Sequence, residues 1–110
     1  MSEQHIEKSK ATVEAADHIP AEKKAELLQS LAKLKPAIAK VSQIHEEDGQ
    51  SIARLLEAST QEATRKEKRA GALKKILDEL KEVIEKFEAS HPKLVELVGE
   101  YSTRLANMGL

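Results

Sequence analysis

The sequence predicts an all-α protein, and three observations lead to that class. Apolar residues recur at alternating steps of three and four along most of the chain, which keeps one face of an α-helix apolar. Short segments with proline or glycine separate these stripes. Folding the two C-terminal stripes together pairs only apolar residues. We therefore expect one domain over residues 1–110, either a four-helix antiparallel bundle or an extended helical hairpin with one long central helix. The expected helices are at about 3–16, 21–45, 50–89 and 92–108.

Two of these helices lie in the N-terminal half. Residues 3–16 carry a narrow apolar stripe, so this helix should pack against the next one. Pro20 disfavours helical geometry in the preceding residue and suits the first turn of the helix over 21–45. Pro36 lies inside that second helix, where it removes a backbone hydrogen bond. The stripe keeps its phase across Pro36, which favours a kinked continuous helix over two short helices broken near Lys35.

The central segment is predicted to be one long helix. His45–Gly49, with Asp-Gly at its tip, is typical of a turn. A single heptad frame then continues from Ile52 to Phe87. A helix over residues 50–89 would be roughly 60 Å long, and its middle offers few large apolar side chains. Because glycine costs up to about 1 kcal/mol relative to alanine in a helix, a bend or fraying near Gly71 is the alternative.

The C-terminal half is predicted to be a helical hairpin around Ser90–Pro92. A break this short forces the two striped helices to run antiparallel and side by side. Each pair of residues that would face one another across the hairpin is apolar, beginning with Phe87 and Leu94 next to the break. This hairpin should anchor one end of the long helix.

Charge and composition exclude several classes of function. Charged residues make up 34% of the chain and nearly cancel, to a formal net charge of −1, which favours neither nucleic acid nor membrane as a partner. Without cysteine there is no disulfide, thiolate metal site or cysteine nucleophile. No apolar run approaches the roughly 20 residues that span a bilayer, and no signal segment is evident. These features predict a cytoplasmic protein.

Residues that could carry chemistry do not converge. The four histidines lie in separate segments without the spacing of a zinc motif, so we expect no metal site. Ser90 and His91 could form a catalytic pair. Adjacent residues on a tight break rarely bring hydroxyl and imidazole into hydrogen-bonding geometry, however, and no carboxylate is specified to orient the histidine. A helix cap is the preferred interpretation. We expect no enzyme, no catalytic residue and no cofactor.

One basic cluster lies in the middle of the predicted long helix. Its members are Arg65, Lys66, Lys68, Arg69, Lys74 and Lys75. They could contact an anionic partner such as a phosphate backbone. They are spread around the helix, however, and no aromatic residues are interleaved for base stacking. We prefer a solvated helix middle and keep weak binding of nucleic acid or another anionic surface as the alternative function.

Two observations favour a protein-interaction module. Residues 46–62 are mostly acidic and residues 65–75 mostly basic, so two long helices crossed antiparallel near Ala63 would match in charge, which predicts a homodimer. The apolar faces of the two C-terminal helices are wider than one neighbouring helix can cover. Four residues make up the additional width: Ile76, Val83, Val95 and Leu97. They meet the chain's own core, a second subunit or the helix of a partner protein. The first functional hypothesis is a non-enzymatic interaction or scaffold protein that self-associates through helix faces.

Part of the chain resembles a known family. Residues 80–92, which end in Phe-Glu-Ala-Ser-His-Pro, and the closing residues 105–110 are similar to small bacterial helical proteins of domain-of-unknown-function family 4404. The N-terminal half resembles that family more loosely, so the resemblance covers roughly residues 3–42 and 72–110. The stretch between them is longer and more charged than the family leads us to expect. The resemblance implies a helical fold and carries no biochemistry.

Overall fold

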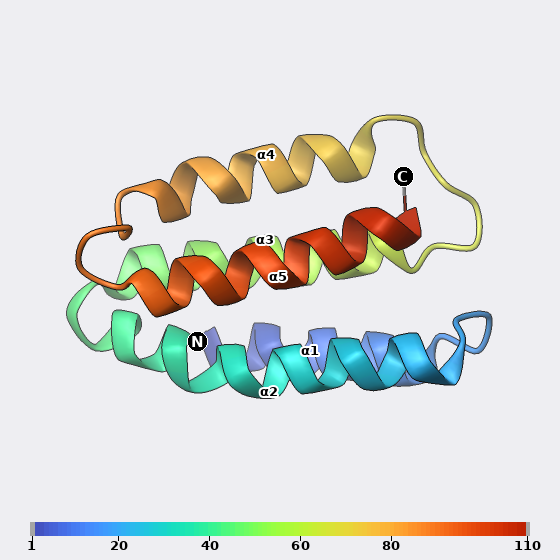
Figure 1. Cartoon of the computed structure of the whole chain (residues 1–110), viewed down its shortest axis with the longest axis horizontal. Helices are drawn as coiled ribbons and strands as arrows, with labels where there is room; N and C mark the ends of the chain where they lie inside the picture. Colours follow the sequence, from blue (N-terminus) through green and yellow to red (C-terminus); the bar gives the residue numbers. More distant parts are fainter. Residues whose placement is uncertain (1, 110) are drawn as a thin grey trace.

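In the part of the chain that the structure describes, five helices alternate in direction. The computed structural model describes the backbone of residues 2–109 and the side chains of residues 3–108. The helices are α1 (Ser2–Ala15), α2 (Ala21–Ile44), α3 (Glu46–Ala63), α4 (Ala72–Glu85) and α5 (Pro92–Gly109). Consecutive helices run antiparallel, so α1, α3 and α5 point one way and α2 and α4 the other (Figure 1). The all-α prediction is confirmed, whereas the arrangement of four helices is wrong.

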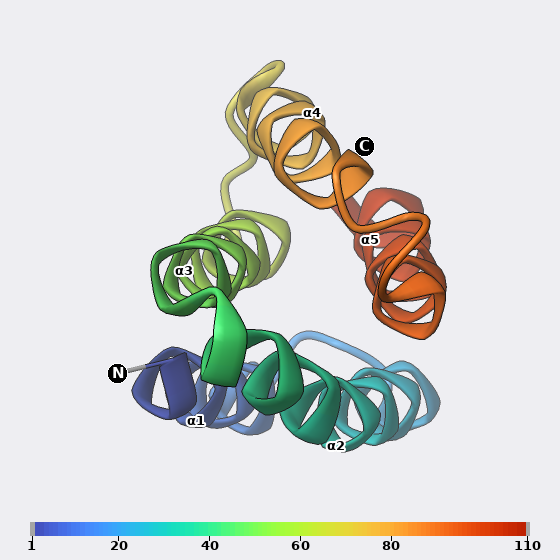
Figure 2. The same ribbon diagram turned by 90° about the vertical axis from the view of Figure 1, so that its left-hand side faces the viewer.

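Helix α3 is the element around which the others are arranged. It contacts all four other helices, whereas α1 and α4 each contact only two in the described part of the chain. In the end-on view, α1 and α2 lie side by side below α3, and α4 lies above it (Figure 2). Ile52 and Leu56 on α3 are fully buried, as the heptad frame predicted. Helix α3 is therefore the central element of the fold.

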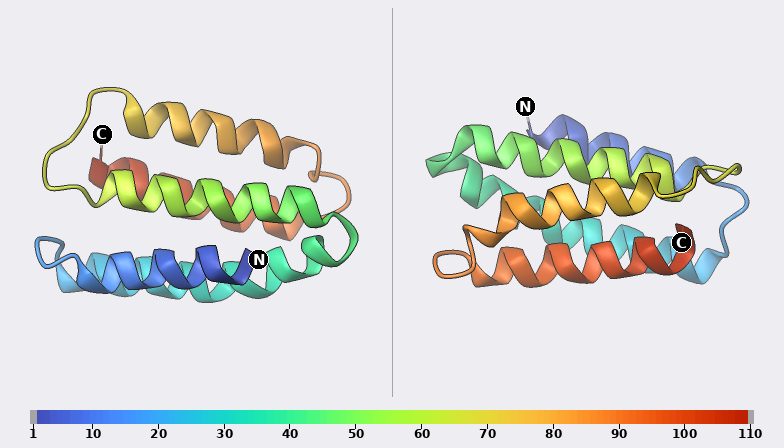
Figure 3. Two further views of the ribbon diagram at one scale, coloured as in Figure 1. Left: turned by 180° about the vertical axis from the view of Figure 1, so that it is seen from behind. Right: turned by 90° about the horizontal axis from the view of Figure 1, so that it is seen from above.

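The predicted long helix over residues 50–89 does not exist. The chain leaves α3 after Ala63, passes through a loop at residues 64–71 and returns alongside as α4 (Figure 3). The longest dimension of the molecule is 38 Å, too short for the roughly 60 Å that such a helix needs. The reversal brings the apolar face of α4 onto the chain's own core. Because burying a large apolar side chain contributes about 2 kcal/mol, a straight rod that left this face exposed would be much less stable.

Local chemistry ends α3 and starts α4. The last carbonyls of a helix have no partner within it; here Thr64 Oγ1 donates to the Thr60 carbonyl at 2.8 Å, and Lys68 Nζ donates to the Ala63 carbonyl. A cation at this end is also favoured by the helix dipole. Gly71, which directly precedes α4, has φ of 74°, a left-handed conformation that glycine adopts without strain. The sequence suggested that a long helix would bend or fray near Gly71, but the helix already ends at Ala63.

The connection between α2 and α3 is a single residue, His45. Helix α2 is continuous through Pro36. This confirms the prediction of one continuous helix over that of two short helices broken near Lys35. The predicted Asp-Gly turn is wrong, because Gly49 is buried inside α3. A Cβ atom on Gly49 would lie 2.0 Å from Ser42 Oγ, 2.9 Å from its Cβ and 3.0 Å from its Cα. The glycine therefore allows α3 to approach α2 closely, and it does not form the tip of a turn.

The C-terminal hairpin is present as α4 and α5. The two helices are antiparallel neighbours joined by residues 86–91, and Phe87 and Leu94 are buried beside that connection. A buried polar contact also joins α5 to α3: Tyr101 Oη lies 2.5 Å from Thr60 Oγ1, which itself donates to the Leu56 carbonyl at 2.7 Å. Because the Thr60 hydroxyl donates its hydrogen to the Leu56 carbonyl, Tyr101 is the donor to Thr60. Burial raises the pKa of Tyr101 and keeps this hydroxyl neutral.

Candidate functional site

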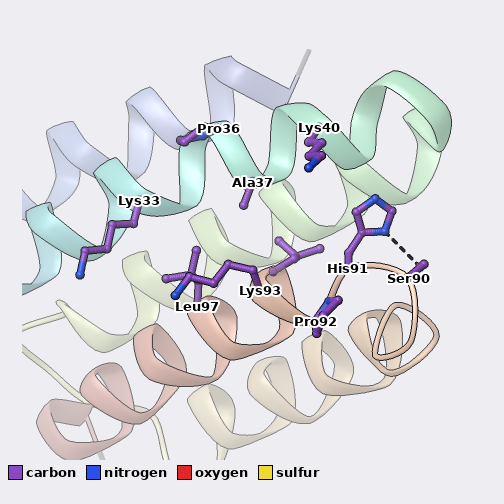
Figure 4. Close-up of a pocket in the computed structure, with 10 residues that line it drawn as sticks. Lys33, Pro36, Ala37, Lys40, Ser90, His91, Pro92, Lys93 and Leu97 are labelled. Atoms are coloured by element: carbon purple, nitrogen blue, oxygen red, sulfur yellow. Dashed lines mark hydrogen bonds between the residues drawn. The ribbon is translucent and has the colours of Figure 1, made fainter.

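A groove of about 650 Å³ lies between α2 and the start of α5 (Figure 4). The apolar residues that line it are Pro36 and Ala37 from α2, and Pro92, Leu94 and Leu97 from α5. The cationic residues that line it are all exposed: Lys33, Lys40 and Lys93. None of its ten lining residues is acidic, although the whole chain has 19 acidic residues against 18 Lys and Arg. The groove is thus a local departure from a balanced surface.

The lysines of the groove differ in their own partners. Lys93 Nζ lies 3.6 Å from a carboxylate oxygen of Glu96, one turn along α5. Lys33 and Lys40 make no ion pair with any residue that the structure describes. Both are on α2 at a spacing of i, i+7, so they share one face of the helix. Their charges are available to a ligand in the groove.

The wall formed by α2 continues past the groove to Ile44. Ile44 is 71% exposed, and it is the one large apolar side chain in the described part of the chain that is exposed. It follows Lys40 by four residues and Ala37 by seven, which places all three on the same helix face. Toward the other end of α2, Arg104 of α5 pairs with Glu26 at 2.8 Å and joins the two walls.

The loop before α5 brings Ser90 and His91 together. Ser90 Oγ lies 3.1 Å from His91 Nδ1, so the expectation that these neighbours would not reach hydrogen-bonding geometry is wrong. Among residues 3–108, no carboxylate pairs with His91 to orient it. Phe87 instead holds two histidines by ring contacts, with centroids 5.5 Å from His45 and 5.7 Å from His91. The described residues contain no cluster of three or more His, Asp or Glu that could hold a metal ion.

Part of the predicted basic cluster surrounds a buried glutamate. Glu62 is 4% exposed. Both guanidinium nitrogens of Arg69 that face it donate to its carboxylate, one of them at 3.1 Å, and Arg65 Nε lies 3.6 Å away. The hydrogen bond from Arg69 and the charges of Arg69, Arg65 and Lys68 lower the pKa of Glu62, against the opposing effect of burial. These cations hold the 64–71 loop against the end of α3.

The remaining cations of that cluster are dispersed. Lys66 Nζ lies 3.8 Å from a carboxylate oxygen of Asp17, and Lys74 pairs with Asp78 at 2.9 Å on α4. Lys75 is exposed on α4. Because the chain reverses between Ala63 and Ala72, the six predicted cations do not follow one helix, and most of them contact groups of the chain itself.

Replacing Glu62 by glutamine should therefore make the free energy of unfolding less dependent on pH in the acidic range. A carboxylate with a lowered folded-state pKa stabilises above its unfolded value, near 4.5, and that stabilisation disappears as pH falls through the folded value. At pH 7 we expect a loss on the order of 1 kcal/mol. This loss should shrink as the pH falls below 4.5 and through the lowered folded-state pKa of Glu62. Denaturant unfolding measured from pH 7 to pH 2.5 checks this.

The matched control is Glu67→Gln, because Glu67 is an exposed residue of the 64–71 loop. It should change the unfolding free energy by less than about 0.5 kcal/mol. A Glu62→Gln variant as stable as the parent at pH 7 would contradict the role given to this carboxylate.

The predicted interface residues are not in one place. The predicted crossing of two long helices requires a continuous helix and an exposed Ala63. The helix ends at Ala63, and Ala63 is 1% exposed. Leu97 is buried and lines the α2–α5 groove. Ile76, Val83 and Val95 are half-buried against the core. Val95 also lines a second hollow of about 360 Å³ between α4 and α5.

Comparison with protein families shows which family the chain belongs to. Residues 27–110 match a family described as a domain of unknown function, DUF4404. The chain belongs to this family. The DUF4404 match includes the charged stretch at residues 43–71, which the resemblance set apart, and it does not include residues 1–26. It contains every residue that lines the α2–α5 groove. No curated protein and no solved structure matches the chain.

Sequence reasoning missed Lys33, Ala37 and Lys40. In isolation they are the polar side of an amphipathic helix, and exposed lysines there are ordinary. The opposite wall of the groove begins some fifty positions later in the chain, and no local pattern joins the two. The one available signal was that Lys33 and Lys40 share a face on which no acidic residue stands between them.

Proposed function

We propose that this DUF4404 protein is a non-enzymatic protein-interaction module that binds a partner protein through the α2–α5 groove. The observation that supports the proposal is the lining of the groove, which combines five apolar residues with three lysines and no carboxylate. Of the apolar residues, Pro36 and Pro92 are exposed, Ala37 is half-buried, and Leu94 and Leu97 are buried. Protein interfaces commonly have an apolar centre within a polar rim, and charge complementarity selects the partner. A groove of this lining suits a protein ligand that is partly apolar and negatively charged.

The same groove gives little support to catalysis. Its titratable groups are lysines, which are exposed, and His91, whose ring hydrogen-bonds to Ser90. A serine nucleophile requires a base that is itself oriented by a third group. Among the described residues, no carboxylate pairs with His91 to serve as that third group. The proposal therefore assigns the groove to recognition.

Neither of the other functions considered has an observation in its favour. Nucleic-acid binding relied on Arg65–Lys75, and most of these cations contact Glu62, Asp17, Asp78 or a backbone carbonyl. Self-association relied on a long helix, which the reversal at residues 64–71 replaces. The α2–α5 groove depends on neither feature.

Site-specific photocrosslinking tests the proposal. A benzophenone amino acid in place of Ser90, which is exposed and lines the groove, should give discrete protein adducts in cell extract. Excess parent protein should compete for these adducts, and the Lys33→Glu/Lys40→Glu variant should not. The same amino acid in place of Glu79, exposed on α4, is the control and should give none. Equal labelling at both positions, adducts with nucleic acid, or no protein adduct at Ser90 would overturn the proposal.

A further inference from the structure

Resting on the proposed function, we infer that the occupant of the α2–α5 groove is an acidic amphipathic helix from a different protein. Three features of the groove support this: its charge, the form of its walls, and the exposed Ile44 that continues one wall. Together they define the ligand's sign, its backbone conformation and the placement of its apolar side chains.

Charge sets the sign of the ligand. Lys33 and Lys40 have no carboxylate partner among the described residues, and no acidic residue lines the groove. Residues at a spacing of i, i+7 on a helix are roughly 10 Å apart along its axis. Two glutamates or aspartates at the same spacing on a ligand helix would therefore face both lysines at once. Such pairs steer association and select the partner by charge.

The walls of the groove favour a helical ligand over an extended one. Both walls are α-helices, whose backbone N–H and C=O groups bond to one another within the helix. An extended peptide would find no strand edge here and would leave its own backbone groups unpaired against apolar side chains. A helix satisfies its backbone internally, and it can lay an apolar stripe along the groove.

Ile44 sets the length of the contact and the need for apolar residues. From Lys33 to Ile44 the α2 wall measures roughly 16 Å, about three helical turns. Ile44 is 71% exposed, so an apolar side chain of the ligand near this end would cover it. Exposed Pro36 and Pro92 and half-buried Ala37 provide further apolar surface in the groove.

A second copy of this chain fits the groove poorly. Two copies joined through this face about a two-fold axis would place each patch against its own equivalent. A patch with three lysines and no carboxylate would then face a patch of the same charge. A head-to-tail arrangement needs an exposed apolar side chain elsewhere to insert, and among the described residues Ile44 is the only large one. The ligand is therefore a helix of another protein.

The test uses the full chain and a fluorescent synthetic helix of about 14 residues, with leucines along one face and glutamates flanking them. We expect saturable binding, seen by fluorescence anisotropy, that weakens as salt increases. Lys33→Glu/Lys40→Glu and Ile44→Ser should each weaken it about tenfold. The control Lys10→Glu/Lys75→Glu makes the same charge change at exposed positions away from the groove and should leave binding unchanged. Circular dichroism on each variant confirms folding.

Three comparison probes and one sedimentation measurement can overturn the inference. A peptide with serine in place of leucine that binds equally well would reduce the contact to charge alone. A peptide with lysine in place of glutamate that binds equally well would remove the charge complementarity. Single-stranded DNA that binds as tightly in moderate salt would identify a nucleic-acid surface. Sedimentation that shows a dimer abolished by Ile44→Ser would make a second copy the occupant.

Failure of this inference is distinguishable from failure of the proposed function. If the acidic helix does not bind while position 90 still crosslinks to a protein, the chemistry inferred for the ligand is wrong and the interaction module stands. If crosslinking at position 90 also fails, both are wrong. Binding of the acidic helix that requires Lys33, Lys40 and Ile44 supports the inference directly.

Discussion

Replacement of Leu80 by aspartate should unfold the chain. Leu80 is completely buried on α4, in contact with the core that α3 and α5 share. The substitution loses about 2 kcal/mol of apolar burial. It also places a carboxylate within the apolar core, which costs several kcal/mol more or forces the group to become neutral. A domain of this size has a total stability of about 5–15 kcal/mol, so these losses are of the same order.

Far-UV circular dichroism and urea unfolding measure this effect. Lys81→Asp is the matched control, because Lys81 is the next residue on α4 and is exposed; we expect a change within about 0.5 kcal/mol. Leu80→Ala should give an intermediate loss of about 2–5 kcal/mol through the cavity that it leaves. A Leu80→Asp protein that unfolds cooperatively within about 1 kcal/mol of the parent would show that α4 does not pack as described.

Replacement of Gly49 by alanine should destabilise the chain by about 2 kcal/mol, even though alanine favours a helix over glycine by about 1 kcal/mol. The added Cβ would lie 2.0 Å from Ser42 Oγ, which could rotate away. It would also lie 2.9 Å from Ser42 Cβ and 3.0 Å from Ser42 Cα, and these atoms move only with α2 itself. The two helices would have to separate, and their buried side chains would lose contact.

Gly99→Ala is the control for this prediction, because it makes the same chemical change inside α5. A Cβ atom on Gly99 would meet nothing within 4 Å, so only the helix propensity remains and stability should rise by about 0.5–1 kcal/mol. Thermal unfolding should show a lower melting temperature for Gly49→Ala and a higher one for Gly99→Ala. If Gly49→Ala also raised the melting temperature, the close approach of α2 and α3 at this position would be disproved.

The apolar periodicity correctly predicted α1, α2, the hairpin of α4 and α5, and much of the core. Helix α2 runs through Pro36 because Leu34, Ile38 and Val41 keep one phase across it, and all three are buried. The C-terminal hairpin is present for the same reason. These are properties of a residue and its neighbours within two turns, which is the range over which a helical stripe is defined.

The break in the centre of the chain could not be predicted in this way. The heptad frame from Ile52 to Phe87 continues in phase across residues 64–71, although these residues are not helical. The cations of this loop contact the end of α3: Arg69 pairs with Glu62, and Lys68 donates to the carbonyl of Ala63, the last residue of α3. Such contacts exist only after the chain has turned back, and so they leave no periodic signal.

The sequence by itself determined that the protein is helical, which faces of its helices are apolar, and that its surface charge is balanced, because these follow from local spacing and composition. Only the tertiary structure decided that the central segment folds back as α3 and α4 and that α2 lies beside α5. The physical reason is burial: α4 loses contact with water along its apolar face only by returning along α3 and α5. The groove between α2 and α5, with its lysines from two distant segments, results from that packing.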